Sequence, residues 1–145
     1  MKSMFGRLFR MPFRQVRMLS EAWFLSAAYR FLILYTPFSR LSKKIGTQGY
    51  ETPSDTDYRS IGREIRSVVD IIGRHTPWES KCLVCALTAK KMLNRRGYPC
   101  TLYMGVAQNS EGKMGAHAWL RCGSTVVAGG SGHGFAVTGI FGDKQ

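Results

Sequence analysis

The hydrophobic period of this chain changes once, at Gly97, and that change constrains the fold more than any other feature. Before Gly97, apolar residues recur at helical spacing, and the clearest stripe consists of Ile61, Ile65, Val68 and Ile72. After Gly97, apolar and small residues alternate along the chain, as they do in a buried strand. Helices followed by a run of strands predict an α+β fold with an antiparallel sheet.

Prolines and glycines indicate where the expected helices end. The first third of the chain is helical until Pro37, and a short second helix covers 38–45 and ends at Gly46. A third helix ends near Gly73, and a fourth covers 81–96 before Gly97. Strands are expected over 100–107, 116–122, 125–128 and 135–141, with a glycine-rich bend at 129–134.

The length of 145 residues fits one compact domain. Within it we distinguish a basic and apolar helical segment (1–46), a polar linker loop (47–57) and a core (58–145). The core begins with the third helix and contains every expected strand. We therefore expect the core to hold the functional site.

The chain has 21 basic and 9 acidic residues, for a net charge of +12. Residues 1–44 contain nine of the basic residues and only one acidic residue, Glu21. Such an excess favours acidic partners. No zinc-finger spacing, basic zipper or aromatic-interleaved basic sheet accompanies it, so nucleic-acid binding is not expected. A solvated surface, or contact with a partner protein, an acidic leader or the membrane surface, accounts for the charge.

The cysteines, together with the N-terminal sequence, bear on the cellular compartment. Arginines interrupt residues 1–17, so no secretory signal is recognised there. The apolar run 22–36 is short and contains Arg30, too little to span a bilayer. We expect a cytoplasmic protein with reduced thiols at its four cysteines, which are Cys82, Cys85, Cys100 and Cys122.

Cys82 and His117 are the candidate catalytic pair. Cys82 falls in the first turn of the fourth helix, after the candidate N-cap Ser80, where the helix dipole favours a thiolate. His117 is the only histidine within an expected strand, on the same face as Trp119 and Arg121. A helix-borne thiol facing a strand-borne imidazole is the arrangement that thiol acyl chemistry requires.

Spacing alone leaves other interpretations open. A cysteine on a helix is more often an inert core residue. Cys82 and Cys85 have the spacing of a thioredoxin motif but lack its preceding strand and its interior. A Cys₃His zinc site from Cys82, Cys85, Cys122 and His117 has no second close pair to support it, so no metal is expected.

Several motifs together resemble one family, the lasso-peptide B2 proteins, which are transglutaminase-like cysteine peptidases. The resemblance lies in residues 77–141 and is carried by Pro77-Trp78, Lys81-Cys82-Leu83-Val84-Cys85-Ala86-Leu87, Arg95-Arg96-Gly97-Tyr98, Leu102 with Gly105-Val106, Ala116-His117-Ala118-Trp119-Leu120, and Val126-Val127 with Gly129-Gly130. It implies a transglutaminase/papain-like core in which Cys82 is the nucleophile and His117 the general base.

The resemblance also implies a reaction and its partners. The enzyme would hydrolyse one bond between the leader and the core of a ribosomally made precursor peptide, with no metal or organic cofactor. A separate leader-recognition protein would present the precursor, and an ATP-dependent macrolactam synthetase, the lasso cyclase, would close the ring. Trp119 is a candidate wall of the substrate groove.

The third catalytic residue is unknown. Members of the family often carry an acidic residue on the strand after the histidine strand, but 125–131 contain no carboxylate here. A backbone carbonyl, Thr125, Ser131 or Asp143 are the alternatives. Two other functions also stay open: an acyltransferase on the same dyad, and a non-catalytic basic adaptor that binds acidic peptide or membrane.

Overall fold

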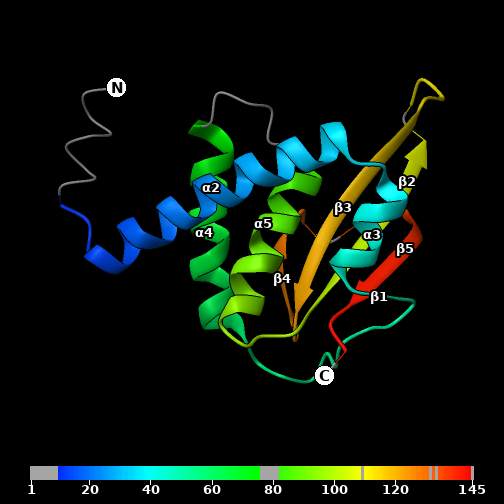
Figure 1. Cartoon of the computed structure of the whole chain (residues 1–145). Coiled ribbons are helices and arrows are strands. Elements are labelled where there is room, and N and C mark those ends of the chain that lie inside the picture. The colour runs from blue at the N-terminus through cyan, green and yellow to red at the C-terminus, as the bar shows by residue number, and fades with distance from the viewer. Residues whose placement is uncertain (1–9, 76–81, 109, 131, 133, 145) are drawn as a thin grey trace.

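The computed structural model describes residues 10–75, 82–108, 110–130, 132, 134–144. The helices come before the strands, except that the two-residue strand β1 lies between α3 and α4 (Figure 1). The helices are α2 (Phe13–Tyr35), α3 (Phe38–Ile45), α4 (Arg59–His75) and α5 (Cys82–Arg95). The strands are β1 (Thr47–Gln48), β2 (Cys100–Gln108), β3 (Met114–Cys122), β4 (Thr125–Ala128) and β5 (Ala136–Gly142). The expected α+β class is confirmed.

The five strands form one antiparallel sheet in the order β1-β5-β2-β3-β4. The long β2–β3 pair is central, and Cys100 lies opposite Cys122 while Gly105 lies opposite His117. The chain turns from α5 into β2 through Gly97, whose φ of 85° is a conformation that glycine adopts without strain. The period change in the sequence therefore coincides with the passage from the helical layer to the sheet.

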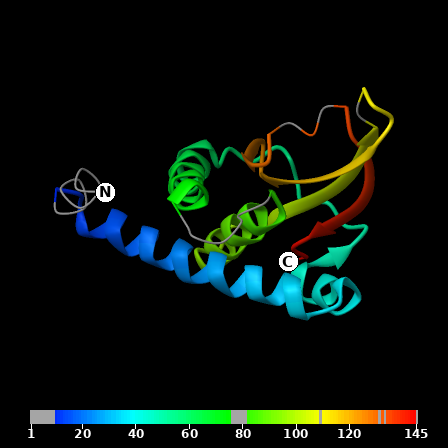
Figure 2. The same ribbon diagram turned by 90° about the horizontal axis from the view of Figure 1, so that it is seen from above.

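α5 is the central helix of the fold. It packs against the sheet on one side, while α2 and α4 pack against it from the other directions (Figure 2). Most of its residues are therefore buried, among them Leu87, Met92 and Leu93. These side chains share one hydrophobic core with Leu102 of β2 and Leu120 of β3.

The alternation of β3 divides its side chains between the two faces of the sheet. Ala118, Leu120 and Cys122 belong to the core under α5. His117 and Trp119 therefore lie on the opposite face, since successive strand residues point to opposite sides. This agrees with the expected alternation.

The segment between α3 and α4 is tied to the sheet by strand pairing and by side-chain hydrogen bonds. Thr47 and Gln48 form β1, which pairs with β5. The Thr52 hydroxyl is buried against the Thr101 hydroxyl, with 2.6 Å between the two oxygens. The boundaries drawn from the sequence at 46/47 and 57/58 stay a prediction.

Among the described helices, none combines the length and the hydropathy needed to cross a bilayer.

Candidate active site

His117 lies where the edge of β3 is left open. β4 pairs only with Leu120–Cys122, so the part of β3 that carries the histidine has no β4 residue beside it. The chain leaves β4 at Ala128 and bends through Gly129 and Gly130, both at positive φ. This bend brings a backbone carbonyl back to the imidazole.

The Nε2 atom of His117 donates a hydrogen bond to the carbonyl oxygen of Gly129, at 2.5 Å. A carbonyl can only accept, so the proton of the neutral ring is on Nε2. Nδ1 is then the unprotonated nitrogen, with its lone pair available for a proton. The contact assigns the two ring nitrogens different roles.

Aromatic rings hold the imidazole in place. The His117 ring packs against Phe135 with centroids 4.9 Å apart, and against Trp119 at 6.1 Å. Trp119 in turn stacks on Tyr103 at 5.6 Å, with the two ring planes nearly parallel. Among the described residues, one hydrogen bond and two ring contacts hold the imidazole.

Trp119 itself is only 7% exposed. A Cβ atom added at Gly132 would lie 2.4 Å from the indole, so the glycine-rich bend lies directly on it. The indole therefore packs against both the His117 ring and Gly132. Its proposed contact with substrate stays a prediction.

Cys82 is the first residue of α5 and is partly buried against the core. Its candidate cap, Ser80, lies outside the described residues, as do Trp78, Ser131 and His133. In the described part of the chain no hydrogen bond joins Cys82 to His117, so the dyad also stays a prediction.

Cys82 and His117 lie at the same end of the α5–β3 layer, but the fold does not bring them together, because the His117 side chain is on the face of the sheet opposite α5. At the other end, the Asn94 amide donates to the Tyr98 carbonyl, and the Cys122 thiol donates to the next carbonyl, that of Pro99. Counted from Asn94, Cys82 lies about 18 Å away toward the start of α5, at a rise of ~1.5 Å per residue. Counted from Cys122, His117 lies about 17 Å away toward the start of β3, at a rise of ~3.4 Å per residue. The helix and the strand run in the same direction (Figure 1).

Two of the other cysteines, Cys85 and Cys100, have environments that disfavour a thiolate. Burial raises the pKa of the Cys85 thiol, with smaller contributions from Asp70 and Cys82. The hydrogen bond to Cys122, followed by burial, raises the pKa of the Cys100 thiol. Cys100 and Cys122 lie opposite each other in the core, at the end of α5 far from Cys82. The described residues contain no group of three side chains suited to hold a metal ion.

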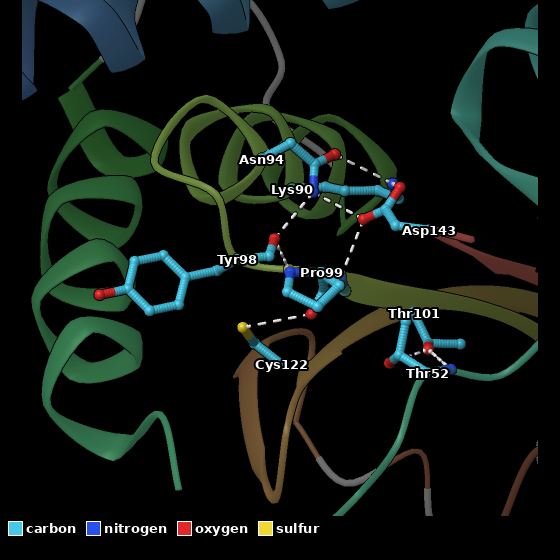
Figure 3. Close-up of polar contacts among 9 residues, drawn as sticks. Thr52, Lys90, Asn94, Tyr98, Pro99, Thr101, Cys122 and Asp143 are labelled. Carbon is cyan, nitrogen blue, oxygen red and sulfur yellow. Dashed lines mark hydrogen bonds and ion pairs between the residues drawn. The ribbon is translucent and has the colours of Figure 1, made fainter. Parts of the chain in front are cut away.

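Asp143, one of the alternatives for orienting the histidine, is engaged elsewhere (Figure 3). Its carboxylate pairs with the Lys90 ammonium and accepts hydrogen bonds from the Asn94 amide at 2.6 Å and the Cys100 backbone N–H at 2.8 Å. Lys90 is only 4% exposed. The network fastens the C-terminus to α5 and β2, at the end of the layer away from His117.

Thr125, another alternative, has a buried hydroxyl with no hydrogen-bond partner among the described residues. The sequence pointed to a backbone carbonyl as one candidate, but it did not indicate that this carbonyl belongs to Gly129. No side chain marks a backbone acceptor, and the run of glycines was the only available signal. The ring contact from Phe135 had no signal of its own.

Comparison with known proteins agrees with this architecture. Residues 23–139 match the family model of the Transglutaminase-like superfamily. The match covers most of the chain, which therefore belongs to this superfamily. The superfamily includes cysteine peptidases and acyltransferases, and the α+β domain is consistent with activity of that type. Neither the curated proteins nor the solved structures gave a match.

Proposed function

We propose that this protein is a lasso-peptide B2-type cysteine peptidase, which removes the leader from a ribosomally made precursor peptide. The observation that carries the proposal is the hydrogen bond from His117 to Gly129, which leaves Nδ1 as the basic nitrogen. Membership of the Transglutaminase-like superfamily supports the reaction type. The motifs around Cys82 and His117 support the particular substrate.

The reaction requires Cys82 and His117 to meet at the end of the sheet that they share. It would begin with transfer of the Cys82 thiol proton to Nδ1 of His117. The thiolate then attacks the carbonyl carbon of the scissile bond, and the backbone N–H groups at the start of α5 stabilise the oxyanion. The imidazolium returns its proton to the leaving amine as the C–N bond breaks. Water, deprotonated by the same imidazole, hydrolyses the thioester and releases the leader acid.

The proposed setting is the cytoplasm, with two partners. A separate leader-recognition protein presents the precursor, and the freed core passes to an ATP-dependent macrolactam synthetase. The peptidase itself needs no cofactor for the steps described. Gly129 replaces the carboxylate that often orients the histidine in the family.

Mass spectrometry of a precursor peptide incubated with this protein and its leader-recognition partner tests the proposal. Wild type should give one cut between leader and core, and Cys82→Ala and His117→Ala should give none. Cys85→Ala and His75→Ala are matched controls that should still cut. If wild type leaves the peptide whole, the hydrolase proposal fails. If Cys82→Ala still cuts, the nucleophile is another residue.

The same experiment separates hydrolysis from acyl transfer. In water enriched in ¹⁸O, hydrolysis puts the heavy oxygen into the new carboxyl group of the leader. With an added primary amine, acyl transfer instead yields an amide of the leader. Predominant amide formation would assign the protein to the acyltransferases of the superfamily.

A further inference from the structure

The outer face of α2 carries a row of exposed apolar side chains, which we call the aromatic stripe. It consists of Trp23, Phe24, Phe31, Leu34 and Tyr35 on α2 and Phe38 at the start of α3. Phe31, Leu34 and Tyr35 are 62%, 58% and 73% exposed. Exposed apolar patches that are continuous in this way mark interaction surfaces.

The aromatic stripe is not the face of α2 that packs against the rest of the domain. The opposite side of α2 buries Met18, Ala22 and Ser26 against the rest of the protein. Phe24, Phe31 and Tyr35 follow one another at i, i+7 and i+11, so they share the other face. The helix is therefore apolar on two faces, and the fold uses only one of them.

Basic residues lie at both ends of the stripe. Arg10, Arg14 and Arg17 precede it, and Arg40, Lys43 and Lys44 follow it on α3. The only acidic residue between positions 10 and 45 is Glu21, and its carboxylate is bound by Arg95, the last residue of α5, and by Arg96, which follows it. The surface around the stripe is therefore cationic.

We infer that the aromatic stripe docks on an anionic lipid bilayer surface. Aromatic side chains settle at the boundary between headgroups and acyl chains, and lysine and arginine bind anionic headgroups beside them. A second copy of the chain would bring the same cations together, so charge opposes self-association through this face. A helix that lies flat on the bilayer surface does not have to cross it, and none of the described helices is long and apolar enough to do so.

The orientation leaves the His117 side of the candidate active site open. α2 and α3 lie along one side of the molecule, and α5 separates α2 from the sheet (Figure 2). His117 and the bend at Gly129 are on the face of the sheet turned away from α5. A bilayer beneath α2 would not block access to His117 on that face.

Co-sedimentation of the purified full chain with vesicles tests the inference. Vesicles of phosphatidylcholine with ~30% phosphatidylglycerol should bind the protein, and vesicles of phosphatidylcholine alone should bind it far less. Phe31→Ser/Leu34→Ser should weaken binding roughly tenfold or more, because both side chains enter the bilayer. Lys43→Gln/Lys44→Gln should weaken it by about fivefold for each charge removed.

Arg66→Gln/Arg74→Gln on α4 removes the same charge away from the stripe and should change binding less than about twofold, with circular dichroism confirming the fold of every variant. Absence of binding to phosphatidylglycerol vesicles would overturn the inference. So would binding that Phe31→Ser/Leu34→Ser leaves unchanged, since the net charge of the protein would then suffice. A wild-type dimer that the same variant dissociates, without vesicle binding, would assign the stripe to a second copy.

Discussion

The Nε2 atom of His117 donates to the carbonyl of Gly129. In the proposed peptidase, this main-chain atom would take the place of the carboxylate that often orients the catalytic histidine. Unlike a carboxylate, a carbonyl carries no net charge with which to stabilise the imidazolium. Its effect is to orient the ring and select the tautomer. A thiol nucleophile tolerates this better than a serine does, because a thiol ionises more readily.

Gly129→Ala should reduce kcat/KM for leader cleavage by about 10- to 100-fold, since the acceptor of the His117 ring would move. A Cβ atom there would lie 2.2 Å from the Ala118 carbonyl oxygen. Gly130→Ala is the matched control, because it has a similar positive φ but nothing within 4 Å of the added atom. It should cost about 1–2 kcal/mol of stability and little activity. Equal activity in the two variants would remove Gly129 from the mechanism.

Iodoacetamide labelling followed by peptide mapping should modify Cys82 first. The pKa of Cys85 and that of Cys100 are raised, so less of either thiol is ionised at neutral pH. The pKa of Cys122 is lowered by its hydrogen bond with Cys100, but Cys122 is fully buried and out of reach of the reagent. Labelling of Cys85 should therefore increase only toward alkaline pH, because the thiolate is the reactive form. His117→Ala should slow the labelling of Cys82 alone. Labelling of Cys85 as fast as Cys82 at pH 7 would contradict the assignment of the nucleophile.

Asp143→Asn should destabilise the protein by about 3–5 kcal/mol, because it leaves the buried Lys90 ammonium without a counter-charge. Urea unfolding measures the loss, and Lys90→Met/Asp143→Asn should recover most of it. Folded Asp143→Asn should keep its kcat/KM. A large loss of kcat/KM with unchanged stability would show instead that Asp143 acts in catalysis.

Glu21→Gln should destabilise the protein by about 1–2 kcal/mol at pH 7, because the carboxylate links α2 to the end of α5 through charge-assisted hydrogen bonds. Burial alone would raise the pKa of Glu21, but Arg96 and Arg95 outweigh it and hold the pKa below the ordinary value of 4.5. The ionised form is thus favoured in the folded state. Its stabilisation is present above pH 4.5 and is lost as the pH falls through the lowered pKa.

Urea unfolding of Glu21→Gln and wild type at several pH values should therefore show a difference that shrinks below pH 4.5. Glu64→Gln is the control, because its pair with Arg14 is more exposed. It should cost less than about 0.5 kcal/mol. A difference between Glu21→Gln and wild type that does not depend on pH would indicate lost packing rather than lost charge.

Local signals in the sequence determined the elements of this fold. Pro37 and Gly97 mark where the first and the last helix end, and the alternation from Cys100 onward marks the first long strand. The same alternation places His117 and Trp119 together on one face. These features depend on residues that are close in the chain, so the hydrophobic periodicity and the positions of proline and glycine are enough to predict them.

Contacts between distant residues were decided only by the tertiary structure. The Gly129 carbonyl meets His117 because the chain bends back after β4, and a backbone acceptor has no side chain that a sequence can reveal. Asp143 reaches Lys90 only because the C-terminus returns beside α5. The sequence also does not show which apolar residues of α2 are buried and which are exposed. Only the packing against α5 separates those that are buried, such as Ala22, from those left outside, such as Phe31.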